Sequence, residues 1–312
     1  MSLPRDSADQ AFVGVKAMLT CFIHLPYNLV FADTMHYPDN SGSYVPVFNF
    51  LITHPTRGLA LFDLGVRKYA NGYPPDIPRV VASRAGETAY KDVADHLREE
   101  DIRPEDVKTV IISHMHWDHI GDPALFTSAE LVLGAGARAA LAEDVYPANP
   151  HGTIQRFPKN QKVTFIDFTN SSSNAQAVLT PFASFSHAID FYGDGSLYLV
   201  DAPGHYRGHI AALARIAPNT FVFLGGDTCH NRQCYVPGTR ITSNRIHYDG
   251  ERAKETINRL AKLNEEADNV VVILAHEAER LEEGMPLFPH DIKDWVTHRI
   301  EKRVAAKTSR QV

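Results

Sequence analysis

The chain has 312 residues, of which 44% are hydrophobic and 22% charged, a composition that supports a buried core and argues against intrinsic disorder. Its formal net charge is −6 and its lysines and arginines form no long block, so nucleic acid is not an expected partner. The three cysteines suggest no disulfide framework and favour a reducing compartment. Without an apolar run of membrane-spanning length or a signal-peptide pattern, we expect a cytoplasmic protein with no membrane partner.

Apolar runs separated by turn residues predict strands in the first third of the chain, at residues 13–25, 45–53 and 59–64. The last two runs flank Pro55-Thr56-Arg57-Gly58 and should form a hairpin. Residues 87–100 carry apolar side chains at helical spacing among charged ones, which predicts an amphipathic helix. Residues 107–113 then form a predicted buried strand that leads directly into a histidine-rich segment.

Three later strands also end in polar residues. They are predicted at 197–200, 221–224 and 270–274, ahead of Pro203-Gly204-His205, Gly225-Gly226-Asp227 and Ala275-His276. Predicted helices at 251–263 and 292–304 complete a mixed succession of strands and helices, which is typical of an α/β layered domain. Long irregular loops are expected at 69–79 and 231–250. The serine-rich stretch 171–174 is too short for an interdomain linker, so residues 1–312 are expected to form a single domain.

The strongest chemical signal is His114-Met115-His116-Trp117-Asp118-His119, which holds four potential metal ligands in six residues. Divalent metals at catalytic sites prefer neutral imidazole nitrogens and carboxylate oxygens. Alternation along a chain leaving a strand would direct His114 and His116 one way, and Asp118 and His119 towards a neighbouring point. That pattern suggests two metals. The alternatives are a solvated polar loop, or a histidine pair hydrogen-bonded to Asp118.

This segment resembles the His-x-His-x-Asp-His signature of the metallo-β-lactamase superfamily. The later polar strand ends occur in that family's order, and the resemblance runs from the strand ending in Asp63 to His276. It implies an αββα sandwich in which two mixed β-sheets are flanked by helices. It also implies a first metal held by His114, His116 and His205, a second held by Asp118, His119 and His276, and a bridging Asp227. The ligand types suit two Zn²⁺ ions, although Mn²⁺, Fe²⁺ or Co²⁺ fit the same set.

Two such metals would hold a hydroxide nucleophile between them, because coordination lowers the pKa of bound water to about 7. The catalytic candidates are Asp118, also counted among the ligands, and His230. His230 follows Asp227 by three residues, where the acyl-homoserine lactonases that the chain resembles carry a substrate-contacting tyrosine. It could donate a proton to the leaving group. A supporting or surface position for His230 is an equally open interpretation.

Other polar and aromatic residues receive simpler interpretations. Asp63 ends a strand and is expected to orient a ligating histidine. His209 is interpreted as a strand residue rather than a further ligand, and Cys229 and Cys234 as packing residues or free thiols because they lack paired Cys-x-x-Cys spacing. A substrate pocket would draw on the irregular stretches, and its candidate wall residues are Phe48, Tyr69, Tyr73, Tyr235 and Ile241, although a plain core or surface position is the favoured interpretation of each.

The expected reaction is hydrolysis of a small-molecule carbonyl substrate, with a lactone as the first choice. A lactam or cyclic carbamate is the close alternative, since the same hydroxide attacks and only protonation of the leaving group differs. A thioesterase of the glyoxalase II type and a non-catalytic binding protein that keeps the fold are the further alternatives. Fold alone does not choose among these activities. The oligomeric state, a homodimer included, stays open.

Overall fold

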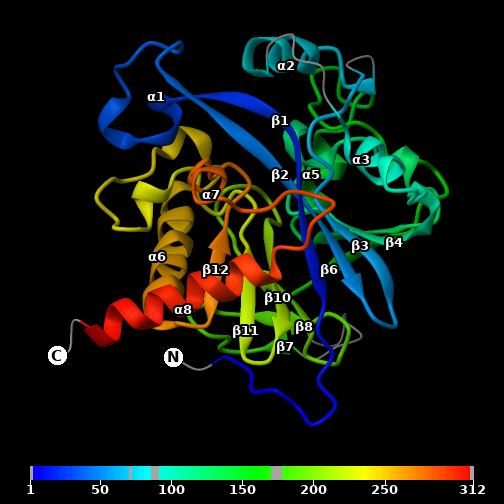
Figure 1. The fold of residues 1–312 in the computed structure, drawn as a ribbon. Helices are drawn as coiled ribbons and strands as arrows, with labels where there is room; N and C mark the ends of the chain where they lie inside the picture. Colours follow the sequence, from blue (N-terminus) through cyan, green and yellow to red (C-terminus); the bar gives the residue numbers. More distant parts are fainter. Residues whose placement is uncertain (1–2, 70–71, 86–90, 170–177, 310–312) are drawn as a thin grey trace.

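The computed structural model describes residues 3–69, 72–85, 91–169 and 178–309, and its centre is a pair of β-sheets (Figure 1). The first sheet holds, in spatial order, β1 (Gly14–Pro26), β2 (Gly42–His54), β3 (Gly58–Phe62), β4 (Val107–Ile111), β5 (Glu130–Gly134) and β6 (Val163–Ile166). The second holds β12 (Val270–Ile273), β11 (Thr220–Leu224), β10 (Ile210–Ala217), β9 (Leu197–Asp201), β8 (Ala188–Asp190) and β7 (Val178–Leu179). Both sheets contain parallel and antiparallel pairs.

Helices flank the two sheets. The described helices are α1 (Tyr27–Val30), α2 (Ile77–Ala85), α3 (Val93–Glu99), α4 (Trp117–Ile120), α5 (Ala137–Glu143), α6 (Gly250–Glu266), α7 (Glu279–Glu282) and α8 (Lys293–Ser309). Helices α3 and α5 pack on the first sheet and α6 packs on the second. The predicted αββα sandwich of two mixed sheets is therefore confirmed.

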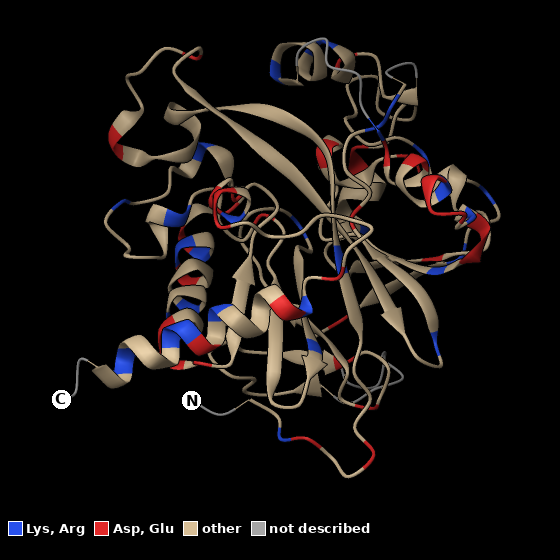
Figure 2. Ribbon diagram, viewed as in Figure 1, with Lys and Arg blue, Asp and Glu red and all other residues tan. Residues whose placement is uncertain are grey.

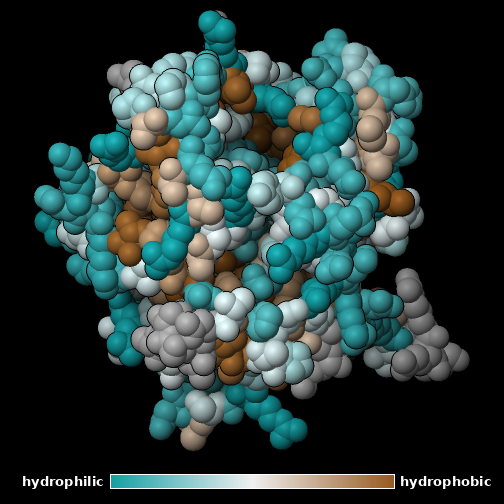
Figure 3. Space-filling view, turned by 180° about the vertical axis from the view of Figure 1, so that it is seen from behind, coloured by the Kyte–Doolittle hydropathy of each residue, from teal (hydrophilic) through white to brown (hydrophobic). Residues whose placement is uncertain are grey.

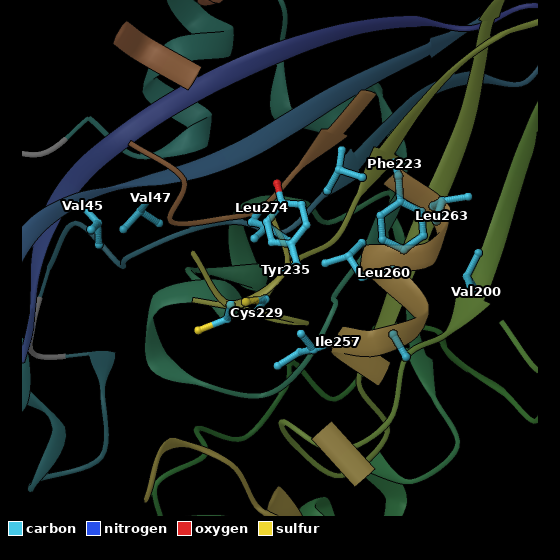
Figure 4. Close-up of a cluster of buried hydrophobic side chains, with 14 of the residues drawn as sticks. Val45, Val47, Val200, Phe223, Cys229, Tyr235, Ile257, Leu260, Leu263 and Leu274 are labelled. Carbon is cyan, nitrogen blue, oxygen red and sulfur yellow. The ribbon is translucent and has the colours of Figure 1, made fainter. Parts of the chain in front are cut away.

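Strands β11 and β12 explain why this sequence builds two hydrophobic layers. Side chains alternate between the faces of a strand. Phe221 and Phe223 therefore pack towards α6, whereas Val222 and Leu224 pack towards the first sheet. Figure 4 shows the outer layer, where Phe223 and Leu274 lie near Leu260 and Leu263 of α6. A strand buried on both faces needs the continuous apolar run that the sequence carries here.

The predicted elements recur with small shifts in their ends, and the hairpin of β2 and β3 is confirmed. The predicted helix 87–100 corresponds to α3, although residues 87–90 lie outside the described residues. The expected loop 69–79 is wrong at its end, because α2 begins at Ile77. The candidate linker 171–174 also lies outside the described residues. The loop 231–250 contains only two short 3₁₀ helices before α6.

The topology gathers four strand ends at one place. Strand β10 is antiparallel to β9 and β11, and β12 is parallel to β11, so β9, β11 and β12 all point the same way. The end of β4 in the first sheet reaches them, because the Ile210 N–H donates to the Ser113 carbonyl at 2.9 Å. The predicted polar strand ends therefore meet.

Acidic and basic residues are intermixed along α6 and α8 (Figure 2). None of the described helices is both long enough and apolar enough to cross a membrane.

Candidate metal centre

The histidine-rich segment turns sharply after β4, and this turn separates its ligands into two directions. His114 follows the end of β4, and His116, in extended backbone, occupies the position before the first residue of α4. The single helical turn of α4 then places Asp118 and His119 beyond that point. His114, Asp118 and His119 are buried and His116 is half-buried, so the segment is not a solvated loop.

Three ring nitrogens converge on one point. His114 Nε2 lies 2.8 Å from His116 Nδ1 and 3.2 Å from His205 Nε2, and the last two nitrogens are 3.0 Å apart. His205 reaches this point from the Pro-Gly-His turn after β9. Gly204 has φ +125°, and a Cβ there would lie 2.2 Å from the Ala253 nitrogen of α6, so only glycine fits.

A second set of atoms lies beside the first and shares Asp227 with it. Asp227 Oδ1 lies 3.2 Å from His119 Nε2 and 3.3 Å from His276 Nε2, and Asp118 Oδ2 lies 3.5 Å from His276 Nε2. Asp227 Oδ2 faces the first set, at 3.3 Å from His205 Nε2. One carboxylate thus presents a different oxygen to each set, and the structure brings all seven predicted ligands together.

Unpartnered polar atoms show that this donor set suits cations. His119 Nε2, His276 Nε2 and Asp227 Oδ1 are buried and have no hydrogen-bond partner among the described residues. Burial disfavours charge on His276, but the carboxylates of Asp227 and Asp118 outweigh it and raise the pKa of His276 to about 10. Buried carboxylates that draw protons onto neighbouring histidines would bind divalent cations at the same positions.

Hydrogen bonds outside the two sets fix the tautomers of the proposed ligands. Asp63 Oδ2 accepts from His119 Nδ1 at 2.8 Å and from the Ser113 hydroxyl at 2.7 Å. Ser113 Oγ lies 3.0 Å from His114 Nδ1, so it can accept that proton while donating its own to Asp63. His276 Nδ1 lies 2.8 Å from the Pro46 carbonyl. In His119, His114 and His276 the Nδ1 proton is held by these partners, so Nε2 is the atom that would ligate a cation.

A second chain of hydrogen bonds begins at His205 and includes a residue that the sequence did not single out. His205 Nδ1 lies 3.2 Å from His247 Nδ1, and His247 Nε2 lies 2.8 Å from the Thr242 hydroxyl. If the proton of His205 lies on Nδ1, His247 Nδ1 accepts this hydrogen bond and the Nε2–H of His247 donates to the Thr242 hydroxyl. The irregular loop 231–250 carries no spacing signal that could have revealed this contact.

His209 supports the centre without facing either set of ligands, in line with its interpretation as a strand-side residue. Its Nδ1 lies 2.9 Å from the Ala202 carbonyl, and its Nε2 accepts from the Asp227 N–H at 3.0 Å. Both ring nitrogens are therefore used, and they hold the backbone of the bridging residue in place. Burial lowers the pKa of His209 to about 3, which keeps the ring neutral as this arrangement requires.

His230 lies inside the centre rather than at the surface. Its Nε2 is 3.0 Å from Asp227 Oδ2, and its Nδ1 is buried without a partner among the described residues. His230 also packs against the rings of His205 and His247, at 4.6 and 5.5 Å between centroids. The neighbouring Cys229 and Cys234 are buried free thiols.

A pocket of about 350 Å³ opens beside both sets of ligands. Its floor includes His116, Asp118, Asp227, His230 and His276. Its walls are mostly apolar and come from the end of β1, from α1 and from α2. Figure 3 shows a hollow with hydrophobic side chains on its walls and a hydrophilic rim in the upper part of the molecule. Such a concave site with a few convergent polar groups suits a small molecule.

The expected pocket wall is wrong, because none of its five residues lines this pocket. Phe48 lies in the core between the sheets. The Tyr73 hydroxyl donates to the Trp117 carbonyl at 2.8 Å, and the Tyr235 hydroxyl donates to Glu277 at 2.8 Å. Tyr69 and Ile241 are exposed. Apolar composition of a loop could not distinguish core, surface and pocket positions.

Comparison with known proteins agrees with this geometry. Residues 45–266 match the family model of the metallo-beta-lactamase superfamily. The metallo-hydrolase mfmC of Annulohypoxylon moriforme is 31% identical, over 84% of this chain and 77% of its own length. The gamma-lactamase FDB1 of Fusarium pseudograminearum is 28% identical, over 83% of this chain and 71% of its own length.

Other matches are partial or concern the fold alone. The cytochrome P450 monooxygenase mpaDE of Penicillium roqueforti is 34% identical over 80% of this chain, and the chain spans about a third (32%) of that protein's length. A solved quorum-quenching N-acyl homoserine lactone hydrolase superposes with a TM-score of 0.64 at 18% identity, over 91% of this chain and 100% of the other. The chain belongs to the metallo-β-lactamase superfamily.

Proposed function

We propose that this protein is a metal-dependent hydrolase that opens a small cyclic carbonyl compound, in the first instance a lactone, at a centre that holds two divalent cations, Zn²⁺ by ligand type. The carrying observation is the placement of Asp227, whose two oxygens face two separate sets of buried ligands. His114, His116 and His205 would hold the first cation, and Asp118, His119 and His276 the second. When bound, such a pair supplies a hydroxide nucleophile at neutral pH and polarises the substrate carbonyl.

The protein's own groups prepare this chemistry. Asp63 and Ser113 keep the proton on Nδ1 of His119 and His114, so that each Nε2 is free to ligate. The apolar pocket walls exclude water around the substrate ring and orient its carbonyl towards the ligand floor. Asp118 lines that floor and is proposed as a ligand that also faces the reacting groups.

A γ-lactam or cyclic carbamate is the second candidate substrate, and the position of His230 favours it. A nitrogen leaving group needs a proton more than an oxygen does. His230 lines the pocket and uses only Nε2 for Asp227, which leaves Nδ1 able to carry a proton to that nitrogen. The sequence relative FDB1 is called a gamma-lactamase, which supports testing this ring type.

The test compares a lactone, a γ-lactam, a cyclic carbamate and a thioester on metal-replete protein and on His230→Ala. His298→Ala is the matched control, because His298 lies exposed on α8. We expect lactone opening by the wild type, and a loss of about 100-fold in lactam opening by His230→Ala if His230 is the acid. If each ring is opened by His230→Ala as fast as by the wild type, His230 has no part in the mechanism. Fewer than one transition metal per chain, with no activity regained on adding Zn²⁺, Mn²⁺ or Co²⁺, would refute the hydrolase proposal.

A further inference from the structure

The pocket beside the metal centre has one basic residue, Arg84, in a wall that is mostly apolar and whose other polar members are Asp144, Thr153 and Tyr206. Ile23 and Leu25 of β1, Leu29 of α1, and Ile77 and Val80 of α2 form this wall. Arg84, one turn after Val80 on the same helix, continues it. Among the described residues, Arg84 is the sole lysine or arginine that lines this pocket.

Arg84 differs from other arginines near the centre, because none of the described residues pairs with it. Arg67 pairs with Asp122 at 2.8 Å, and Arg207 pairs with Glu143. Arg84 makes no hydrogen bond or ion pair with any part of the chain that the structure describes, although its side chain is half-buried. A planar guanidinium offers a fork of N–H donors that matches a carboxylate. The guanidinium of Arg84 borders the pocket, and its N–H donors are not engaged by any described residue.

The surroundings of Arg84 would strengthen such a contact. Burial lowers the pKa of Arg84, since the apolar wall disfavours its charge. An incoming anion would neutralise this charge in a partly dry place, where ionic hydrogen bonds are stronger than in water. The carboxylates of Asp118 and, more weakly, Asp39 attract this charge, and that of Asp118 would be shared with a cation when the centre is loaded.

We propose that Arg84 determines substrate specificity by binding a carboxylate that the substrate carries at the far end of an apolar segment from its scissile ring carbonyl. This inference rests on the proposed ring-opening function and narrows its substrate class to anionic lactones or lactams. The apolar segment would lie along the wall of β1, α1 and α2 while the ring reaches the ligand floor. The competing explanation is that Arg84 only complements the C-terminal end of the α2 dipole.

Paired substrates separate these explanations. A γ-lactone with a short alkyl chain ending in a carboxylate is compared with its methyl ester, on wild type, Arg84→Ala and Arg84→Lys. Arg79→Ala is the matched control, because Arg79 is exposed on the same helix and does not line the pocket. We expect Arg84→Ala to raise KM for the acid by about 10- to 100-fold with little change in kcat or in the ester, and Arg84→Lys to recover part of the loss.

A binding measurement keeps the inference independent of the reaction. Hexanesulfonate carries an alkyl chain and a weakly metal-binding anion, and hexanol is its neutral counterpart. On metal-loaded protein we expect calorimetry to show hexanesulfonate binding that weakens about 10-fold in Arg84→Ala and is unchanged in Arg79→Ala. Equal binding and equal acid-to-ester ratios in wild type and Arg84→Ala would overturn the inference. If no ring is opened but the Arg84-dependent binding is seen, the proposed function fails and the anion site stands.

Discussion

Replacing Asp63 by asparagine tests how the centre sets the proton positions of its ligands. Asp63 Oδ1 accepts from the Ser113 N–H at 2.6 Å, and Oδ2 accepts from the Ser113 hydroxyl and from His119 Nδ1. Asparagine tolerates the positive φ of +62° at this position, so the backbone need not change. Its amide nitrogen would replace Oδ2, however, and would face two groups that now donate. The alternative amide orientation would face the Ser113 N–H instead.

The magnitude follows from the tautomers. To accept from the new amide, His119 must move its proton from Nδ1 to Nε2, where it blocks the proposed second cation. If Ser113 Oγ accepts from the amide as well, its own proton turns towards His114 Nδ1 and the same change occurs at the first cation. Losses at such supporting partners are about 10- to 100-fold in metal affinity, which corresponds to about 1.4 to 2.7 kcal/mol.

Competition titration with a chelator, analysed for two sites, measures this change, and Ser113→Ala is the control. That variant removes the link to His114 but leaves the bond between Asp63 and His119, so it should weaken only the first cation. Asp63→Asn should weaken the second, with or without the first. Two equivalents bound by Asp63→Asn at wild-type affinity would refute the tautomer argument.

Three further predictions concern loading and stability. In metal-free protein the carboxylates outweigh burial and raise the pKa of His119 and His276, whereas burial and neighbouring histidines lower the pKa of His114 and His205. The second cation must therefore displace protons from its ligands, and the first need not. In a metal titration repeated at several pH values, the affinity for the second cation should rise between pH 6 and 8, while the affinity for the first stays unchanged. Opposite slopes would contradict this assignment. His247→Ala removes the acceptor for His205 Nδ1 and should weaken the first cation about 10-fold, more than Thr242→Val, whereas equal affinities would remove His247 from the centre. Arg215 is fully buried against Asp6 and the Gly195 carbonyl, so Arg215→Ala should cost about 3–5 kcal/mol in urea unfolding, and a cost below about 1 kcal/mol would show that Asp6 and its partners relax into water.

Local patterns in the sequence predicted an α/β layered domain and a metal-binding cluster, and the family resemblance carried by that cluster implied the sandwich and the full ligand set. Unbroken apolar runs such as those of β11 and β12 mark strands buried on two faces, and the residues that follow them are fixed to the strand ends. His114, His116, Asp118 and His119 lie within six consecutive residues, and this spacing indicates a metal site. The one-domain organisation, the oligomeric state, the compartment and the identity of the metal stay predictions.

Only the tertiary structure decided which other residues surround the ligands. His247 and Thr242 reach His205 from an irregular loop. Arg84 reaches the pocket from α2, whose first residues were predicted to belong to a loop. The physical reason is that contacts between segments distant in the chain depend on how layers pack, and no periodicity in either segment records them. The same reason explains why Tyr73 and Tyr235, apolar by composition, turned out to be hydrogen-bonded core residues instead of pocket walls.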